Sequence, residues 1–271
     1  MSLASREALA SARESLDALA DNTSVDAAKL ADELAAVTAL LDREVSLRRV
    51  LTDPAQPGEA KAELAKRLLG GQVGGECADL LAGMVRLRWS RSRDLVDATE
   101  ELASSADLVA AERQGVLDDV EDELFRFGRI VASDSALRSA LTDKVADRAA
   151  KAGLVRRLLD GRANPVTERL VARLVTAPRG RSLEAGLNAL SKLAAERRDR
   201  TVAVVTSAVP LDDRQKQRLG DALAKLYGRR VHLNMDVDPE VIGGIEVRIG
   251  DEVINGTIAD RLSEAERRMA G

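Results

Sequence analysis

The chain has 271 residues, long enough for two or three domains that each bury a core. Its 41 lysines and arginines against 45 aspartates and glutamates give a net charge of -4, whereas a dedicated nucleic-acid binder is usually basic. With one tryptophan, one tyrosine and two phenylalanines, aromatic platforms for bases or sugars are hard to build. The single cysteine excludes an intramolecular disulfide and a cysteine-based zinc site, so we expect a reduced, cytoplasmic protein without a cofactor or metal.

The sequence also lacks the marks of a membrane protein. No stretch approaches the roughly 18 uninterrupted apolar residues of a membrane-spanning helix. The first residues, MSLASREALASARE, carry charges where a signal peptide has its apolar region. Any contact with a membrane is therefore expected through a partner.

An internal repeat divides the chain. Positions 32–92 align without gaps with positions 122–182, at an offset of 90 residues, and 21 of the 61 pairs are identical. Roughly five or six identities would occur by chance in so Ala-, Leu- and Arg-rich a composition. The period is too long for a solenoid tile of roughly 20–50 residues, so each copy is predicted to be a complete small helical bundle.

Apolar residues at three- and four-residue spacing predict the helices of the first copy. The stripes are Leu9, Ala12, Leu16 and Leu19; Leu30, Leu34, Val37 and Leu41; Leu64 and Leu68, after Pro57; and Leu80, Leu81, Met84, Val85 and Leu87. Gly70-Gly71 is predicted to end the third helix, because glycine adopts left-handed backbone angles with little strain.

The connection between the copies has no proline and little turn chemistry from about 93 to 131, so one long connecting helix is predicted there. The second copy then repeats the helical pattern, with Leu124, Phe127, Ile130 and Val131 in its first stripe and a turn at 161–165. The predicted domains are a helical bundle at 1–105, whose connecting helix continues to about 131, a second helical bundle at 106–199, and a tail at 200–271.

The tail contains predicted strands. The β-branched sequence TVAVVTS at 201–207 is typical of a strand, and 231–237 and 245–249 alternate apolar and polar residues as half-buried strands do. Gly250-Asp251 suits a two-residue hairpin turn.

Helices are predicted on either side of the last two of these strands. Asp212 with Gln215 resembles a capping box, opening a helix that ends at Gly228, and Thr257 with Asp260 is predicted to cap a last helix to about Met269. The predicted fold class is mainly α: two tandem small helical bundles followed by a small α/β domain in the order strand, helix, strand, strand, helix.

Two lone side chains could carry chemistry. His232 lies on the polar side of a predicted strand, without the Ser, Cys or carboxylate arrangement of a catalytic triad, so a surface histidine is the preferred interpretation. Cys77 lies at the start of a predicted helix, where a thiol pKa can be lowered, but a plain small residue is preferred.

Two short motifs could bind phosphate. Gly243-Gly244 matches neither the dinucleotide fingerprint nor the P-loop and precedes a strand, so a bend or bulge is preferred. The run 86–93 contains four arginines and Trp89, and a solvated basic helix end or a protein interface is preferred to nucleic-acid binding. No base, nucleophile and oxyanion donor come together, which indicates a protein that works by binding.

The stretch 231–250 resembles the signature of the delta subunit of bacterial F-type ATP synthase, the counterpart of the mitochondrial oligomycin-sensitivity-conferring protein. The residues at the family's spacing are Val231, Leu233, Val237, Asp238, Val241, Gly243, Gly244, Ile245, Val247, Arg248 and Gly250. Asn255 departs from the pattern, since the family often has Asp there. Without one 90-residue unit the chain is close to the family's usual length, so it is similar to an actinobacterial form with a duplicated helical domain.

The resemblance implies a non-catalytic peripheral-stalk subunit at the cytoplasmic face of the cell membrane. Its helical domains are expected to hold N-terminal segments of alpha subunits and its C-terminal domain to hold subunit b, so that rotor torque is resisted. The resemblance implies no cofactor, no nucleic acid and no direct transmembrane contact. Two alternatives are a free-standing helical adaptor unrelated to the ATPase and a nucleotide-binding enzyme that uses Gly243-Gly244.

Overall fold

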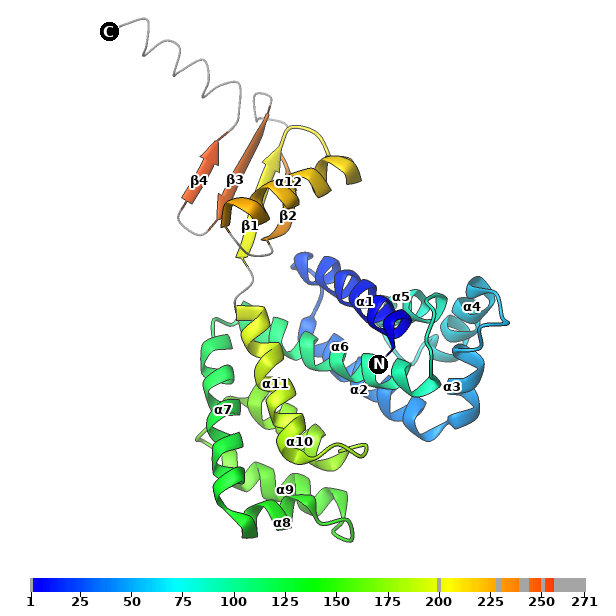
Figure 1. Cartoon of the computed structure of the whole chain (residues 1–271), viewed down its shortest axis with the longest axis vertical. Helices are drawn as coiled ribbons and strands as arrows, with labels where there is room; N and C mark the ends of the chain where they lie inside the picture. The colour runs from blue at the N-terminus through cyan, green and yellow to red at the C-terminus, as the bar shows by residue number, and fades with distance from the viewer. Residues whose placement is uncertain (1, 199–200, 228–230, 239–243, 250–251, 256–271) are drawn as a thin grey trace, which may run out of the picture. The chain divides into compact units, whose positions relative to one another are not determined.

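The computed structural model describes residues 2–198, 201–227, 231–238, 244–249 and 252–255, which belong to two compact units divided between Arg198 and Asp199 (Figure 1). The first unit is helical, and the second holds a four-stranded sheet with one described helix. The chain is therefore mainly α with a small α/β domain at its C-terminal end, which confirms the predicted fold class.

The helical unit contains eleven helices. They are α1 (Leu3–Asp21), α2 (Ala27–Arg43), α3 (Val45–Leu51), α4 (Gly58–Leu69), α5 (Gly75–Arg86), α6 (Ser92–Arg113), α7 (Leu117–Ser133), α8 (Ser135–Thr142), α9 (Arg148–Leu159), α10 (Pro165–Thr176) and α11 (Leu183–Arg198). Local signals set several of their ends. For example, α10 begins with Pro165, and the side chain of Asn164 accepts a hydrogen bond from the N–H of Val166 at 2.9 Å.

The second copy reproduces the helices of the first at the same 90-residue offset. Helices α2, α4 and α5 begin and end 90 residues before α7, α9 and α10. Side-chain contacts recur as well, because Arg48 donates to the carbonyl oxygen of Leu41 at 3.2 Å and Arg138 donates to that of Val131 at 3.4 Å. The repeat in the sequence is therefore a repeat of the fold.

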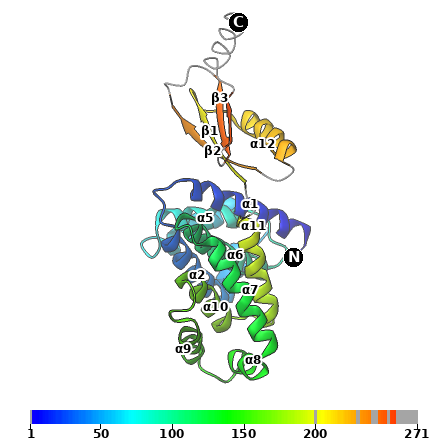
Figure 2. The same cartoon turned by 90° about the vertical axis from the view of Figure 1, so that its left-hand side faces the viewer.

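Helix α6 belongs to both copies. It packs along α2 as α11 packs along α7, and it contacts α10 and α11 as α1 contacts α5 and α6 (Figures 1 and 2). Buried residues of α1 also have buried counterparts 90 positions later on α6: Ala8 and Ala98, Ala12 and Leu102, Leu16 and Ala106, Asp17 and Asp107. The boundary predicted between 105 and 106 thus falls inside one helix, which closes the first bundle and opens the second.

The prediction of one helix from about 93 to 131 is wrong. Helix α6 ends at Arg113 and α7 begins at Leu117. Between them Gly115 adopts a φ of 70°, and the N–H of Val116 donates to the carbonyl oxygen of Ala111 at 3.0 Å. This backbone pattern is the Schellman motif, in which a left-handed glycine turns the chain out of the helix.

Each copy has its own hydrophobic core. The predicted stripes of α1 and α2 contribute to the first core, which extends to α6, and Leu34, Leu81 and Leu102 are among its fully buried members. The second core extends from α6 to α11 and includes Leu124 and Leu170. Aliphatic residues and alanine make up most of both cores, with Trp89 in the first and Phe127 in the second, so the helices can pack closely.

The second unit is a sheet with helix α12 (Asp213–Tyr227). Its strands are β1 (Thr201–Ser207), β2 (Val231–Val237), β3 (Ile245–Ile249) and β4 (Glu252–Asn255), in the order β2-β1-β3-β4. Strand β2 is parallel to β1, while β3 is antiparallel to both β1 and β4. Val205 and Val247 form the core with Leu223 of α12.

The predicted capping box of α12 is confirmed. The N–H of Gln215 donates to Asp212 Oδ1 at 2.7 Å, and the N–H of Asp212 donates to Gln215 Oε1 at 2.9 Å. The predicted element order missed β4, which pairs with β3 and adds a fourth strand. The predicted helix end at Gly228, the turn at Gly250-Asp251 and the last helix from Thr257 to Met269 lie outside the described residues.

Candidate partner-binding surfaces

Most signature residues form the framework of the sheet. Val231, Leu233, Ile245 and Val247 lie in the core against α12. On the opposite face, Arg248 pairs across the strands with Val204 of β1 and Val253 of β4, and all three side chains are exposed. Within the described part of the second unit no element covers this row. It is therefore a candidate surface for a partner.

The other signature residues lie at the ends of strands. Val237 ends β2, and the N–H of Asp238 donates to the carbonyl oxygen of Ser207 at 3.0 Å. Gly244 has a φ of 94° and leads into β3, whereas a phosphate loop leads into a helix. This geometry supports the predicted bend. Val241, Gly243 and Gly250 lie outside the described residues.

The lone cysteine is buried. Cys77 is fully inaccessible at the start of α5, and burial raises the pKa of its thiol to about 12. A protonated thiol is a poor nucleophile, so the plain small-residue interpretation holds. His232 lies in β2 opposite Val202, and its side chain is outside the described part of the chain.

The basic run 86–93 leads from the last residue of α5 into the start of α6, and its four arginines are exposed, as the solvated interpretation expects. Helix α5 ends at Arg86, and Trp89 is buried with its indole Nε1 donating to the carbonyl oxygen of Met84 at 2.8 Å. Arg86 pairs with Glu59 at 2.8 Å. The tryptophan ring belongs to the core and presents no face on which a base could stack.

Ion pairs join the two copies. Asp107 of α6 is fully buried and accepts hydrogen bonds from Arg169 and Arg173 of α10, the first at 2.6 Å. Arg173 also donates to Asp32 of α2 at 2.7 Å. Burial raises the pKa of Asp107, while both guanidinium groups oppose that rise. Sequence analysis missed this cluster, although Arg169 and Arg173 are one helical turn apart on the same face.

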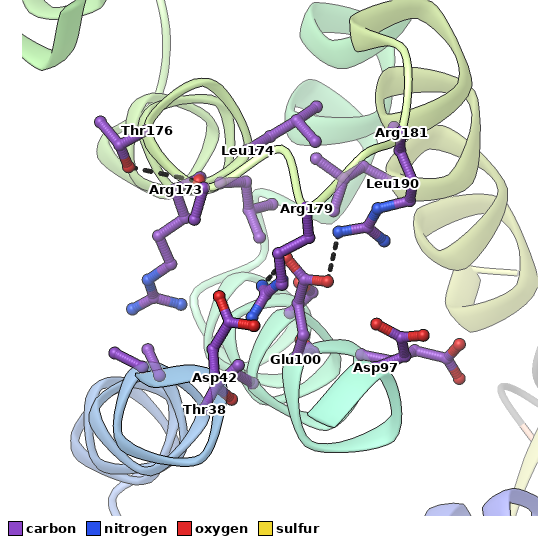
Figure 3. A pocket seen from close by; sticks show the side chains of 18 of the residues that line it. Thr38, Asp42, Asp97, Glu100, Arg173, Leu174, Thr176, Arg179, Arg181 and Leu190 are labelled. Atoms are coloured by element: carbon purple, nitrogen blue, oxygen red, sulfur yellow. Dashed lines mark hydrogen bonds and ion pairs between the residues drawn. The ribbon is translucent and has the colours of Figure 1, made fainter. Parts of the chain in front are cut away.

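A second cluster borders a cavity. Glu100 of α6 forms ion pairs with Arg179 and Arg181 from the segment between α10 and α11 (Figure 3). The Arg179 side chain is 7% exposed, and its φ of 47° is the one positive value for a non-glycine residue in the described chain. The adjoining cavity has a volume of about 770 Å³ and lies among α2, α6, α10 and α11. Since its charged groups largely pair with one another, the cavity is a feature of the junction between copies.

Asp97 is the exception among the carboxylates that line this cavity. It is half-buried on α6, and it forms no hydrogen bond or ion pair with any residue that the structure describes. Burial raises the pKa of its carboxyl group, and the positive charges of Arg181 and Arg93 oppose that rise. The ionised form of Asp97 is therefore disfavoured in the folded state.

A groove lies on the second copy between α7, α8 and the end of α9. Its volume is about 300 Å³, and its lining includes Phe127, Ile130, Leu137, Leu158, Arg126 and Arg162. Ile130 is 52% exposed, and Phe125 on the same helix is 57% exposed. We refer to the groove with these six lining residues as the arginine groove.

Two kinds of feature are absent from the part of the chain that the structure describes: a cluster of metal-ligating side chains and an apolar helix of membrane-spanning length. Among them, no three His, Cys, Asp or Glu side chains are grouped as metal ligands. No helix there has both the length and the apolar character needed to cross a membrane.

Comparison with known proteins decides the family. The model of the family "ATP synthase delta (OSCP) subunit" matches residues 103–269, which is more than half of the chain. The chain belongs to the ATP synthase delta (OSCP) family. The match covers the second copy and the tail, and its lower limit falls within the shared helix α6.

Relatives of this delta-family chain match it over nearly its whole length. A protein of Streptomyces griseus named "ATP synthase subunit delta" is 77% identical over 100% of both chains. One from Kineococcus radiotolerans with the same name is 46% identical over 98% of this chain and 96% of its own. A chain in a cryo-EM structure of the Toxoplasma gondii mitochondrial ATP synthase hexamer matches 62% of this chain and 95% of its own, at 17% identity and a TM-score of 0.29, a likeness too weak to inform the fold.

Proposed function

We propose that the chain is a non-catalytic subunit of the peripheral stalk of a proton-translocating F-type ATP synthase, which holds the catalytic head against rotor torque. The observation that carries this proposal is the 77% identity over the whole length to a protein named "ATP synthase subunit delta". The described side chains fit such a role, because they are used for packing and ion pairing rather than for a nucleophile with its base. A free-standing adaptor unrelated to the ATPase does not account for the family membership.

The proposed contacts divide between the two units. The helical unit binds N-terminal segments of alpha subunits, since a helical bundle can hold the apolar face of a partner helix. The C-terminal unit binds subunit b, and the exposed row Val204, Arg248 and Val253 is the surface we assign to it. The assembly then lies at the cytoplasmic face of the cell membrane.

The test uses inverted membrane vesicles from a strain that lacks the chain. Purified full-length chain should restore ATP-driven proton pumping, measured by quenching of a ΔpH-sensitive dye, and should hydrolyse no ATP by itself. The variant Val204→Glu/Val253→Glu should restore less pumping and recover less subunit b on affinity purification. Arg49→Glu, an exposed position on the helical unit, is the control. Failure of the wild-type chain to restore pumping or to co-purify with alpha and b would overturn the proposal.

A further inference from the structure

The two copies differ in charge at and beside the arginine groove. Arg126, Arg129 and Arg162 of the second copy occupy the positions of Ala36, Ala39 and Gln72 in the first. Arg126 and Arg129 lie one turn apart on α7, and Arg162 follows the end of α9. The second copy therefore has two arginines in the lining of the groove and a third, Arg129, beside it on α7, at positions where the first copy has uncharged residues.

No residue that the structure describes neutralises these three charges. All three arginines are exposed, and none forms an ion pair with a residue in the described part of the chain. Glu123 lines the groove, but its carboxylate already accepts hydrogen bonds from the N–H of Asn164 and the hydroxyl of Thr167. Asp122, one turn before Arg126, forms no ion pair with it. The guanidinium groups are thus available to an external anion.

The face of α7 beside the groove also differs from its counterpart on α2. On α2 the positions equivalent to Phe125 and Arg129 are Ala35 and Ala39, which line the junction with α10 and α11. Small side chains there allow another copy of the repeat to approach. On α7 the large exposed Phe125 and the charged Arg129 would obstruct a further copy, so the face is adapted to a different occupant.

We propose that the arginine groove is the docking site for an acidic amphipathic helix of a partner polypeptide. Aliphatic side chains at i and i+3 or i+4 of that helix enter the groove between Ile130 and Leu158, and its Glu or Asp side chains pair with the three arginines. A volume of about 300 Å³ holds a few aliphatic side chains rather than a whole helix, so the helix lies across the groove. An anionic lipid surface would satisfy the charges but would not fill a concave apolar groove. The site goes beyond the proposed function, which assigns no partner to this face.

The test uses the isolated full-length chain and needs no assembled complex, so its outcome is independent of the proposed function. The probe is a fluorescent 20-residue synthetic helix with Leu at i, i+3, i+4 and i+7 on one face and Glu at the other positions. Binding is measured by fluorescence anisotropy. A second peptide has Lys in place of every Glu, and vesicles of anionic phosphatidylglycerol provide the membrane arm.

We expect the Glu peptide to bind and the Lys peptide to bind at least tenfold more weakly. The variant Arg126→Ala/Arg129→Ala/Arg162→Gln has the residues of the first copy at these positions. Its affinity for the Glu peptide should be at least tenfold lower than that of the wild type. The control Arg49→Ala/Arg67→Ala/Arg88→Ala removes three exposed arginines that have no partner in the described part of the first copy, and should change affinity less than twofold. Circular dichroism would verify that both variants are folded. The proposal would be overturned if the two peptides bound equally, or if the groove variant bound the Glu peptide as tightly as the wild type. It would also be overturned if the Glu peptide did not bind while vesicles bound in a way that depends on the same three arginines.

Discussion

The carboxylate of Glu123 accepts a hydrogen bond from the backbone N–H of Asn164 at 2.9 Å, which ties the start of α10 to α7. Ninety residues earlier, Glu33 accepts a hydrogen bond from the N–H of Gly74 at 3.0 Å and ties the start of α5 to α2. In both copies the glutamate satisfies an N–H at a helix start that has no partner within the helix. The same glutamate-to-backbone hydrogen bond is therefore present in both copies, although their surface residues differ.

Removal of either glutamate should act within its own copy. Glu33→Ala leaves the Gly74 N–H without its acceptor and should destabilise the first copy by about 1 kcal/mol. Amide hydrogen exchange by NMR should then be faster at Gly74 and unchanged at Asn164. Glu123→Ala should give the converse pattern. If either variant increased the exchange rates of both amides equally, the two hydrogen bonds would not act independently.

The close approach of α10 and α11 depends on Gly186. A Cβ at this position would overlap the buried side chain of Leu174, at 2.8 Å from Cδ2 and 3.0 Å from Cγ. Gly186→Ala should therefore lower the melting temperature by about 3–8 °C, as overpacking does in a chain of this size. In the control Gly83→Ala, the new Cβ has no neighbour within 4 Å, and the better helix propensity of alanine should leave stability equal or higher. A similar loss in both variants would contradict the packing argument.

The carboxyl group of Asp97, which pairs with no residue that the structure describes, should make the stability of the fold depend on pH. Its pKa in the folded state lies above the ordinary value of 3.8, so ionisation at neutral pH opposes folding, and this penalty disappears as the pH falls through the folded pKa. Asp97→Asn should raise the melting temperature by about 1–2 °C at pH 7.5, because the group is half exposed and the penalty is small. The gain should vanish near pH 4. Thermal melts at four pH values would measure it.

Asp107 differs from Asp97 because its buried carboxylate is paired with two arginines. Burial raises its pKa too, yet its carboxylate accepts hydrogen bonds from two arginines. Asp107→Asn should lower the melting temperature at neutral pH, because it leaves Arg169 and Arg173 facing a neutral amide at the junction. A gain in stability from this substitution would show that desolvation outweighs the pairing.

Cys77 and Trp89 should together report on the core of the first copy. Both are buried there, and the thiol pKa of about 12 leaves almost no thiolate at pH 8. Labelling of Cys77 by a maleimide should be slow in the native chain and should become fast over the same urea range in which the Trp89 emission shifts to longer wavelength. Rapid labelling of the native chain would show that the first core opens locally.

Much of this fold was accessible from the sequence. The stripes of α1 and α2 and the capping box of Asp212 with Gln215 are local signals, and each is confirmed by burial or hydrogen bonds. The repeat is visible because residues such as Arg48 and Arg138 make the same contacts and have remained identical.

Prediction from the sequence failed where a single residue ends a helix, or where contacts between distant parts of the chain determine what a residue does. Gly115 ends α6, although the surrounding residues favour a continuous helix. The double role of α6 is hidden because its sequence must satisfy two bundles at once, and it shows little identity to α1. The ion pairs of Asp107 and Glu100 connect positions far apart in the chain, so no local pattern indicates them. The arginine groove was missed for the same reason, although comparison of Arg126 with Ala36 across the repeat would have revealed it.

A helix that serves two bundles makes the chain extendable in fixed steps. Deleting residues 22–111 would join α1 directly to α7 and place Asp17 opposite Arg169 and Arg173, where Asp107 now lies, so a single six-helix bundle could close. In the opposite direction, α11 could begin a third bundle as α6 begins the second only if Phe125 and Arg129 of α7 were replaced by small residues, as at Ala35 and Ala39 of α2. Lengthening the helical unit therefore requires five new helices and small residues on the helix face where the new bundle packs, because each added bundle shares its first helix with the bundle before it.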